Sequence, residues 1–170
     1  IQDKMKEKSI EKTDVVGVGA GVPAPVSKEG SVERTANLGW GKKEVKKELE
    51  ELLGLPVNVG NDANVATLGE LWKGGGKGRR SAVMVTLGTG VGGGVVVDGR
   101  IVAGCNGGAG ELGHITVEPA ETVPCACGKY GCLEQYASAN GIVRLAKRML
   151  AESGKPSALR ARETFTSKDI

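Results

Sequence analysis

Aromatic residues, long apolar runs and an excess of one charge are all scarce in this 170-residue chain. Only 3% of the residues are aromatic, so platforms that stack the bases of single-stranded nucleic acid are not available in number. No apolar run has the length of a membrane span, and Ile1–Lys4 lack the apolar core of a signal peptide. The 23 basic and 20 acidic residues nearly cancel, which indicates a solvated surface. These absences favour a cytoplasmic protein whose partners are neither a membrane nor a nucleic acid.

The chain is rich in glycine, and three of its four cysteines are clustered. The 28 glycines show no collagen-like period, and they lie in separate loops between apolar runs. His114, Cys125, Cys127 and Cys132 offer the ligand set of a closed tetrahedral zinc site, which leaves no open position and therefore predicts a structural metal. Surface thiols or a redox pair are the alternative. Cys105 lies outside this spacing, and we expect it to be a small buried residue.

Helical and strand patterns alternate along the chain, which predicts an α/β layered fold. Expected helices cover residues 2–12, 42–53 with a glycine end, 62–72, and 138 to about 150. Expected strands cover residues 14–18, 56–59, 81–87, 91–97, 100–102 and 115–117, with a loop at 19–26 and a hairpin turn at Asp98-Gly99. Residues 165–170 resemble the cap and first turn of a further helix, so we expect both ends of the chain to be cut.

Three further segments carry residues suited to chemistry, and each has a plain structural alternative. Asp62, in Asn61–Asn64, starts a predicted helix, where capping competes with a role as the base that accepts a hydroxyl proton. In Gly88–Gly90 the close glycines and one hydroxyl suit phosphate oxygens, but a plain glycine-rich hairpin fits as well. Glu111 and Glu134 flank the predicted metal loop and are either site carboxylates or solvated surface charges.

Taken in order, five motifs resemble the ROK (repressor, ORF, kinase) family of sugar kinases and repressors, most of all its bacterial glucokinases. They are Asn37-Leu38-Gly39-Trp40, Asn61-Asp62-Ala63-Asn64, Leu87 to Gly94, Gly110 to His114, and Cys125 to Glu134. The resemblance implies an actin-like, ribonuclease-H-like α/β ATPase fold that is incomplete at both ends. Residues 1–80 would end an N-terminal α/β domain, and residues 81–170 would start a C-terminal one.

The resemblance also implies a role for each motif. Asp62 matches the catalytic base, which takes the proton of a sugar hydroxyl. His114 would place one ring nitrogen on zinc and turn the other toward the sugar. The loop of Gly88, Thr89 and Gly90 matches a phosphate loop for ATP. The residues that match sugar-binding positions are Asn37, Asn61, Asp62, Glu111, His114 and Glu134.

The resemblance implies ATP-dependent phosphorylation of a hexose, with glucose as the expected substrate. It also implies a homo-oligomer that contains structural zinc and uses ATP and magnesium as co-substrate. Two features of the family have no counterpart here: an opening Gly-Gly-Thr turn that holds ATP phosphates and magnesium, and an adenine-binding region. We therefore expect the chain to be inactive alone. A sugar-responsive repressor of the same family, a kinase for another hexose or N-acetylhexosamine, and an inert zinc-binding fragment stay open as alternatives.

Overall fold

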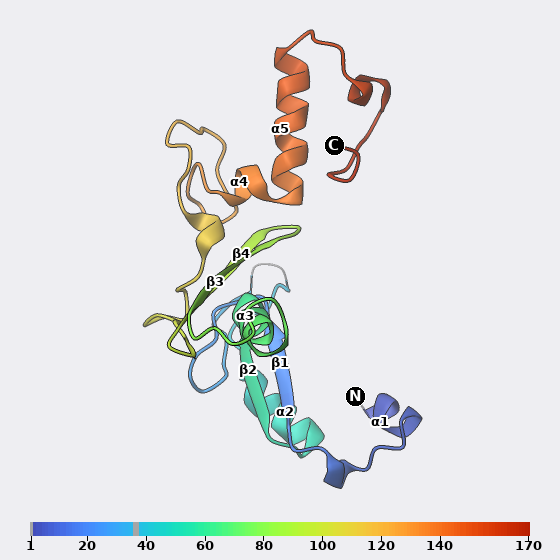
Figure 1. Ribbon diagram of the computed structural model, residues 1–170, viewed down its shortest axis with the longest axis vertical. Helices are drawn as coiled ribbons and strands as arrows, with labels where there is room; N and C mark the ends of the chain where they lie inside the picture. The colour runs from blue at the N-terminus through green and yellow to red at the C-terminus, as the bar shows by residue number, and fades with distance from the viewer. Residues whose placement is uncertain (1, 36–37) are drawn as a thin grey trace.

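The computed structural model describes residues 2–35 and 38–170, and Asn37 lies outside the described residues. Its elements form two small sheets with helices at their sides and ends (Figure 1). The α-helices are α1 (Gln2–Glu7), α2 (Val45–Leu53), α3 (Asp62–Lys73), α4 (Glu134–Ala137) and α5 (Ala139–Glu152). The strands are β1 (Val18–Val22), β2 (Val57–Asn61), β3 (Ala82–Leu87), β4 (Val91–Val97) and β5 (Arg100–Ile101). Short 3-10 turns cover Lys12–Asp14 (η1), Leu112–His114 (η2) and Ala158–Ala161 (η3).

The first sheet consists of the parallel strands β1 and β2, which pair from Val18 opposite Val57 onward. The connection between the strands runs through α2, which packs on β2. Gly54 ends this helix in the left-handed conformation, with a φ of 59°, where a residue with a Cβ would be strained. The helix predicted over 42–53 and its glycine end are confirmed, although the helix begins at Val45.

The strand predicted at residues 14–18 is wrong in position, because β1 occupies the glycine-rich stretch that follows it. Val16 is 95% exposed, whereas Val22 at the end of β1 lies in the core. A Cβ at Gly21 would lie 3.1 Å from a methyl group of Val65 on α3, so the missing side chain lets this helix approach the strand. Glycine here marks close packing and not the loop that the sequence pattern indicated.

The second sheet is antiparallel, in the order β3–β4–β5. Asp98 and Gly99 join β4 to β5 with φ values of 51° and 78°, the positive pair that a two-residue hairpin turn requires. The predicted turn at Asp98-Gly99 and the strands predicted at 81–87 and 91–97 are confirmed, whereas the strand predicted at 100–102 is shortened to the two residues of β5. The strand predicted at 115–117 is reduced to one bridge, Thr116 opposite Cys132, because this segment pairs only with the tight loop that follows it.

The ends of the chain carry the remaining predicted elements. α5 confirms the helix predicted from Ser138, whose hydroxyl oxygen accepts the Gly141 N–H at 2.9 Å and caps the first turn. α1 covers only the first part of the helix predicted over 2–12. At the tail, the Asp169 carboxylate accepts the Thr166 N–H at 2.7 Å, which closes a single turn.

Glycines of β4 let α3 lie directly on the second sheet. A Cβ at Gly92 would come within 3.3 Å of the Ala63 methyl group, and one at Gly94 would overlap the Thr67 hydroxyl. Thr67 is 1% exposed and donates its hydroxyl to the Ala63 carbonyl at 2.7 Å, so it cannot move aside freely. Because α3 also packs on β1 and β2, this one helix joins the two sheets. The predicted domain boundary after residue 80 falls between α3 and β3 and stays a prediction.

The opposite face of β4 is covered by the segment that leads to the predicted metal loop. A Cβ at Gly93 would lie 2.5 Å from the Gly110 carbonyl oxygen and 2.7 Å from Leu112. Gly113 is buried, and a Cβ there would overlap the Val91 carbonyl. β4 is therefore held between α3 on one face and residues 110–113 on the other.

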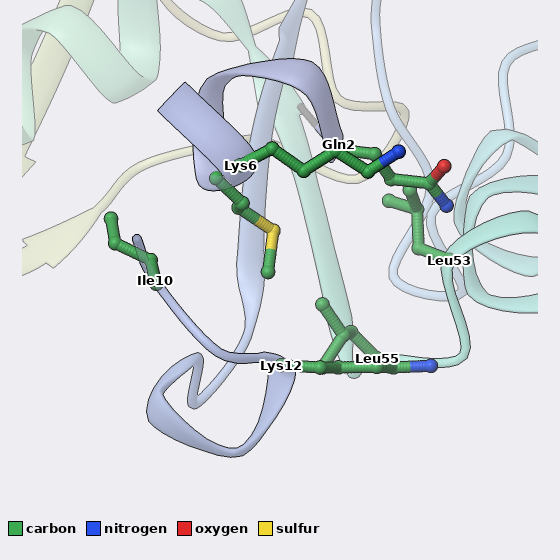
Figure 2. Close-up of a pocket in the computed structure, with 7 residues that line it drawn as sticks. Gln2, Lys6, Ile10, Lys12, Leu53 and Leu55 are labelled. Carbon is green, nitrogen blue, oxygen red and sulfur yellow. The ribbon is translucent and has the colours of Figure 1, made fainter. Parts of the chain in front are cut away.

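A pocket lies between α1 and the end of α2, with α1 on one side and Leu53 and Leu55 on the other (Figure 2). It is lined by Gln2, Met5, Lys6, Ile10, Lys12, Leu53 and Leu55, none of which is a predicted site residue. This hollow is mainly apolar and lies apart from the chemistry that the sequence predicts. Among the residues that the structure describes, none of the helices combines the length and apolar character of a membrane span.

We expect Gly94→Ala to destabilise the protein, because the added methyl group meets buried Thr67 with no room to shift. Overpacking of a well-packed site costs about 1–3 kcal/mol, and urea denaturation measures it as a lower unfolding midpoint. Gly19→Ala is the matched control: Gly19 lies in β1, and a Cβ there meets nothing within 4 Å. Equal midpoints for the two variants would contradict the close packing of β4 on α3.

Candidate functional site

Asp62 lies where β2 ends and α3 begins, and it is exposed. The helix is capped by Asn61, whose side-chain oxygen accepts the Asn64 N–H at 3.1 Å. Asp62 is the first helical residue, and its carboxylate accepts the N–H of Ala63 at 2.8 Å. The N-cap is therefore Asn61, and Asp62 also stabilises the first turn of α3 through the Ala63 N–H. The Asp62 carboxylate keeps an exposed face for chemistry.

Asn61 also ties this corner to the segment after β1. Its side-chain amide donates to the Ala24 carbonyl at 3.4 Å, and Ala24 is buried. Both polar ends of the Asn61 side chain thus have partners inside the chain. The role of Asn61 in binding sugar stays a prediction, and its scaffold role is one that the sequence motif did not reveal.

His114, Cys125, Cys127 and Cys132 come together as predicted, with their ligand atoms all within 4.8 Å of one another. The Cys127 and Cys132 sulfurs are 3.7 Å apart, and Nδ1 of His114 lies 3.8 Å from the Cys125 sulfur. Zinc–sulfur bonds of about 2.3 Å in a tetrahedron separate two sulfurs by about 3.8 Å. The four side chains therefore already have the spacing of a structural zinc site.

Burial and crowding of the thiols also fit a cation. Burial, followed by the neighbouring thiols of Cys127 and Cys125, raises the pKa of the Cys132 thiol to about 12. Burial acts in the same direction on Cys127, but hydrogen bonds from the Lys129 backbone N–H and the other thiols outweigh it and lower the pKa of Cys127. A thiol as reluctant to ionise as Cys132 becomes a thiolate readily only beside a positive metal ion.

His114 turns its two ring nitrogens to different neighbours. Nδ1 faces the Cys125 sulfur, and Nε2 lies 4.0 Å from a carboxylate oxygen of Glu111. The Glu111 backbone carbonyl also accepts the His114 N–H at 3.0 Å, because the chain forms the short η2 turn. Glu111 therefore lies beside Nε2, on the side of the imidazole away from the thiols. A sugar site shared by Glu111 and His114 requires this arrangement.

Glu134 lies beside the predicted phosphate loop. Its Oε2 atom accepts the Val91 backbone N–H at 2.9 Å, and a Cβ at Gly90 would lie 2.5 Å from the same oxygen. Glu134 is half-buried and begins α4, two residues after the predicted metal ligand Cys132. The structure therefore connects the metal loop to the Gly88–Gly90 loop, a contact that motif spacing does not reveal.

The Gly88–Gly90 loop is the turn between β3 and β4. The Gly88 N–H donates to the Gly90 carbonyl at 2.9 Å, and Thr89 is exposed at the tip. Its carbonyls receive hydrogen bonds from the start of α5, which lies over the hairpin tip in Figure 1. The loop is a hairpin turn that is also held by hydrogen bonds from α5. A glycine-rich hairpin and a phosphate loop, the two interpretations of the sequence, are therefore compatible.

Glu121 is a buried carboxylate that the sequence analysis missed. Its side chain accepts hydrogen bonds from the Tyr136 hydroxyl at 2.7 Å and from the Val123 N–H at 3.1 Å, and it pairs with Arg144 at 2.9 Å. These partners, the Tyr136 hydroxyl first, lower the pKa of Glu121 from 4.5 to about 2. No local motif marks Glu121; only the fold brings α4 and α5 to it.

Cys105 is exposed, so the expectation of a small buried residue is wrong. It lies in a turn after β5, within a glycine-rich stretch. Asp62 shares no hydrogen bond with the metal cluster among the residues that the structure describes. Asp62 and the metal-ligand cluster lie on opposite sides of β4. Helix α3, which carries Asp62, covers one face of the strand, and residues 110–113, which lead to the cluster, cover the other.

A model of the ROK family matches residues 1–169. The chain belongs to the ROK family. Among curated proteins, the glucokinase of Halalkalibacterium halodurans is 46% identical over 93% of this chain and 51% of its own length. The xylose repressor of Caldicellulosiruptor bescii is 34% identical over 86% of this chain and 38% of its own length. The chain spans about half the length of the curated relatives it matches.

Solved ROK structures share the fold. A ROK glucokinase from Streptomyces griseus in complex with glucose and AMPPNP matches 82% of this chain and 45% of its own, with 41% identity and a TM-score of 0.71. A ROK transcriptional regulator, described as a homologue of the E. coli MLC protein, matches 99% of this chain and 42% of its own, with 31% identity and a TM-score of 0.83. The chain thus has the mixed α/β, actin-like ATPase fold of ROK kinases over part of their length, which confirms the predicted family and fold class.

We expect one zinc ion per chain, bound by the four clustered side chains and lost in Cys127→Ser. Elemental analysis of protein purified without chelators measures it. Cys105→Ser is the control, since this exposed thiol lies outside the cluster and its loss leaves the metal in place. Wild-type protein that contains no metal would contradict the assignment.

The low pKa of Glu121 predicts acid sensitivity. Its ionised form is favoured in the folded state, so its stabilising effect is complete above pH 4.5 and is lost as the pH falls toward about 2. Thermal unfolding between pH 2 and 7 should show a steep fall in Tm in this window. Glu121→Gln should lower Tm at pH 7 and flatten the fall, whereas Glu152→Gln, exposed at the end of α5, should not. A wild-type slope retained in Glu121→Gln would argue against this network.

Proposed function

We propose that the whole protein to which this chain belongs is an ATP-dependent hexose kinase that converts glucose to glucose 6-phosphate. The observation that carries the proposal is the exposed carboxylate of Asp62 at the start of α3, which the cap by Asn61 leaves available. The 46% identity to a glucokinase supports the same function. The 41% identity to a glucokinase solved with glucose and AMPPNP supports glucose and ATP as the substrates.

In the proposed reaction, Asp62 accepts the proton of the sugar hydroxyl while the hydroxyl oxygen attacks the γ-phosphorus of ATP. The new oxygen–phosphorus bond forms as the bond to the β,γ-bridging oxygen breaks, and ADP leaves with that electron pair. A base contributes by position as well as by proton affinity, because it must lie within hydrogen-bond reach of the hydroxyl. The direct succession of β2 and α3 at Asn61 and Asp62 fixes that position.

The sugar would be bound by polar side chains gathered around the metal loop. With Nδ1 bound to zinc beside the thiols, His114 would carry its proton on Nε2 and could donate it to a sugar oxygen beside Glu111. Glu134 uses Oε2 for the Val91 N–H, so Oε1 is the oxygen for a sugar hydroxyl. Asn37 and Asn61 complete the proposed set. A bound zinc ion would supply a fixed anchor for this loop.

Phosphate oxygens of ATP would meet the tip of the β3–β4 hairpin. The Gly88 and Val91 N–H groups are already bonded, to the Gly90 carbonyl and to Glu134. The Thr89 hydroxyl and the N–H groups of Thr89 and Gly90 are therefore the proposed donors. These amides suit anions and not a divalent cation, so we assign no magnesium ligand to this loop.

A sugar-responsive repressor is the second candidate function. The TM-score of 0.83 to a ROK transcriptional regulator over 99% of this chain and the 34% identity to a xylose repressor favour it. A repressor would use the same sugar and zinc residues but would not need Asp62 as a base. Kinases for other hexoses or for N-acetylglucosamine stay within the kinase proposal, since an N-acetyl-D-glucosamine kinase of Erwinia tasmaniensis is 39% identical over 73% of this chain.

We expect Asp62→Asn in the whole protein to reduce glucose-dependent ADP formation by at least about 10²–10⁴-fold, because the amide keeps the shape but accepts no proton. A coupled assay measures it, with glucose binding by calorimetry as a check on the fold. Asp98→Asn, in the exposed β4–β5 turn, is the matched control and should retain wild-type turnover. Unchanged turnover in Asp62→Asn would remove Asp62 from its role. Wild-type protein that binds glucose without turnover would instead favour the repressor.

A further inference from the structure

The Gly88–Gly90 loop is anchored by the first turn of α5 through two consecutive carbonyls. The Ala139 backbone N–H donates to the Gly88 carbonyl at 2.8 Å. The Asn140 side-chain amide donates to the Thr89 carbonyl at 3.3 Å. Neither donor belongs to a motif that sequence analysis singled out, and neither contact belongs to the β3–β4 ladder.

These two contacts fix the direction of two N–H groups. All described peptide bonds are trans, so each carbonyl points opposite to the N–H of the following residue. With the Gly88 and Thr89 carbonyls directed at α5, the N–H groups of Thr89 and Gly90 point away from it. Two successive amides that face the same open side form an anion-binding concavity.

The α5 end of this arrangement is rigid. Ser138 is 2% exposed; its hydroxyl oxygen accepts the Gly141 N–H, and its own N–H donates to the Glu134 carbonyl at 3.2 Å. A Cβ at Gly141 would lie 2.7 Å from the carbonyl groups of α4, so the two helices are in close contact. Glu134 at the start of α4 bonds the far end of the loop at Val91.

We propose that Asn140 is a positioning residue that, together with Glu134, directs the Thr89 and Gly90 amides toward a phosphate group. The inference rests on the proposed role of this loop in binding ATP and identifies what orients it. Because Glu134 also belongs to the proposed sugar site, one carboxylate is shared between the hexose and the phosphate loop. Sugar and nucleotide binding are therefore coupled through α4 and α5.

Asn140→Ala in the zinc-loaded whole protein tests the positioning role. We expect AMPPNP affinity, measured by calorimetry, to fall roughly fivefold, in line with the loss of one hydrogen bond, while glucose affinity in the absence of nucleotide is unchanged. Asn58→Ala is the matched control, since Asn58 is exposed on β2 in the other sheet. Unchanged AMPPNP affinity in Asn140→Ala would overturn the proposal.

Hydrogen exchange separates failure of this inference from failure of the proposed function. The Ala139 and Val91 amides, which bond the loop and Glu134, should exchange faster in Asn140→Ala than in wild type, whether or not the protein turns over ATP. If wild type binds no AMPPNP but these amides lose protection, the kinase proposal fails and phosphate positioning fails with it, whereas the anchoring of the loop by Asn140 holds. If their exchange rates do not change, the positioning role is wrong.

Discussion

The lack of side chains along one stretch of β4 is the constraint on which the other parts of this structure depend. Gly92 and Gly94 admit α3 on one face, and Gly93 admits Gly110 and Leu112 on the other. Any Cβ at these positions would push one layer away from the sheet. Asp62 lies on the first layer and His114 on the second, so the thickness of a strand without side chains sets the distance between the proposed base and the predicted metal loop.

Two unlike devices would then hold the predicted metal loop in its conformation, one within the loop and one toward α4 and α5. A metal ion would draw His114 together with three thiols, one of which ionises only reluctantly without it. Glu121 supplies a separate charge network that joins the same loop to Tyr136 and Arg144 on the helices behind it. Because the cluster depends on metal and the Glu121 network depends on pH, loss of the metal would leave the Glu121 network in place, and protonation of Glu121 would leave the cluster in place. The position of Glu134 is thus fixed from two sides.

Local sequence patterns were sufficient to predict those features in which a residue type has a single physical role. The glycine end of α2, the Asp98-Gly99 turn, the Ser138 cap and the metal ligand spacing could all be predicted from a few adjacent residues. Prediction failed where tertiary packing decides. The glycines of β1 marked a helix contact and not a loop, and Glu121 and Asn140 gain their roles from partners 15 and 51 residues away.

The contacts of Glu134 also bear on why one family contains both kinases and repressors. Glu134 accepts the Val91 N–H through one carboxylate oxygen. In the proposed site its other oxygen would bind the sugar, and the position of the Gly88–Gly90 loop would then depend on sugar occupancy. By linkage, if sugar changes the affinity of the loop for its ligand, that ligand would change sugar affinity by the same factor. A kinase would use this coupling to align ATP only when sugar is bound. A repressor would need the same movement as its signal, with no phosphoryl transfer, so the proposed sugar half of the site serves either function unchanged.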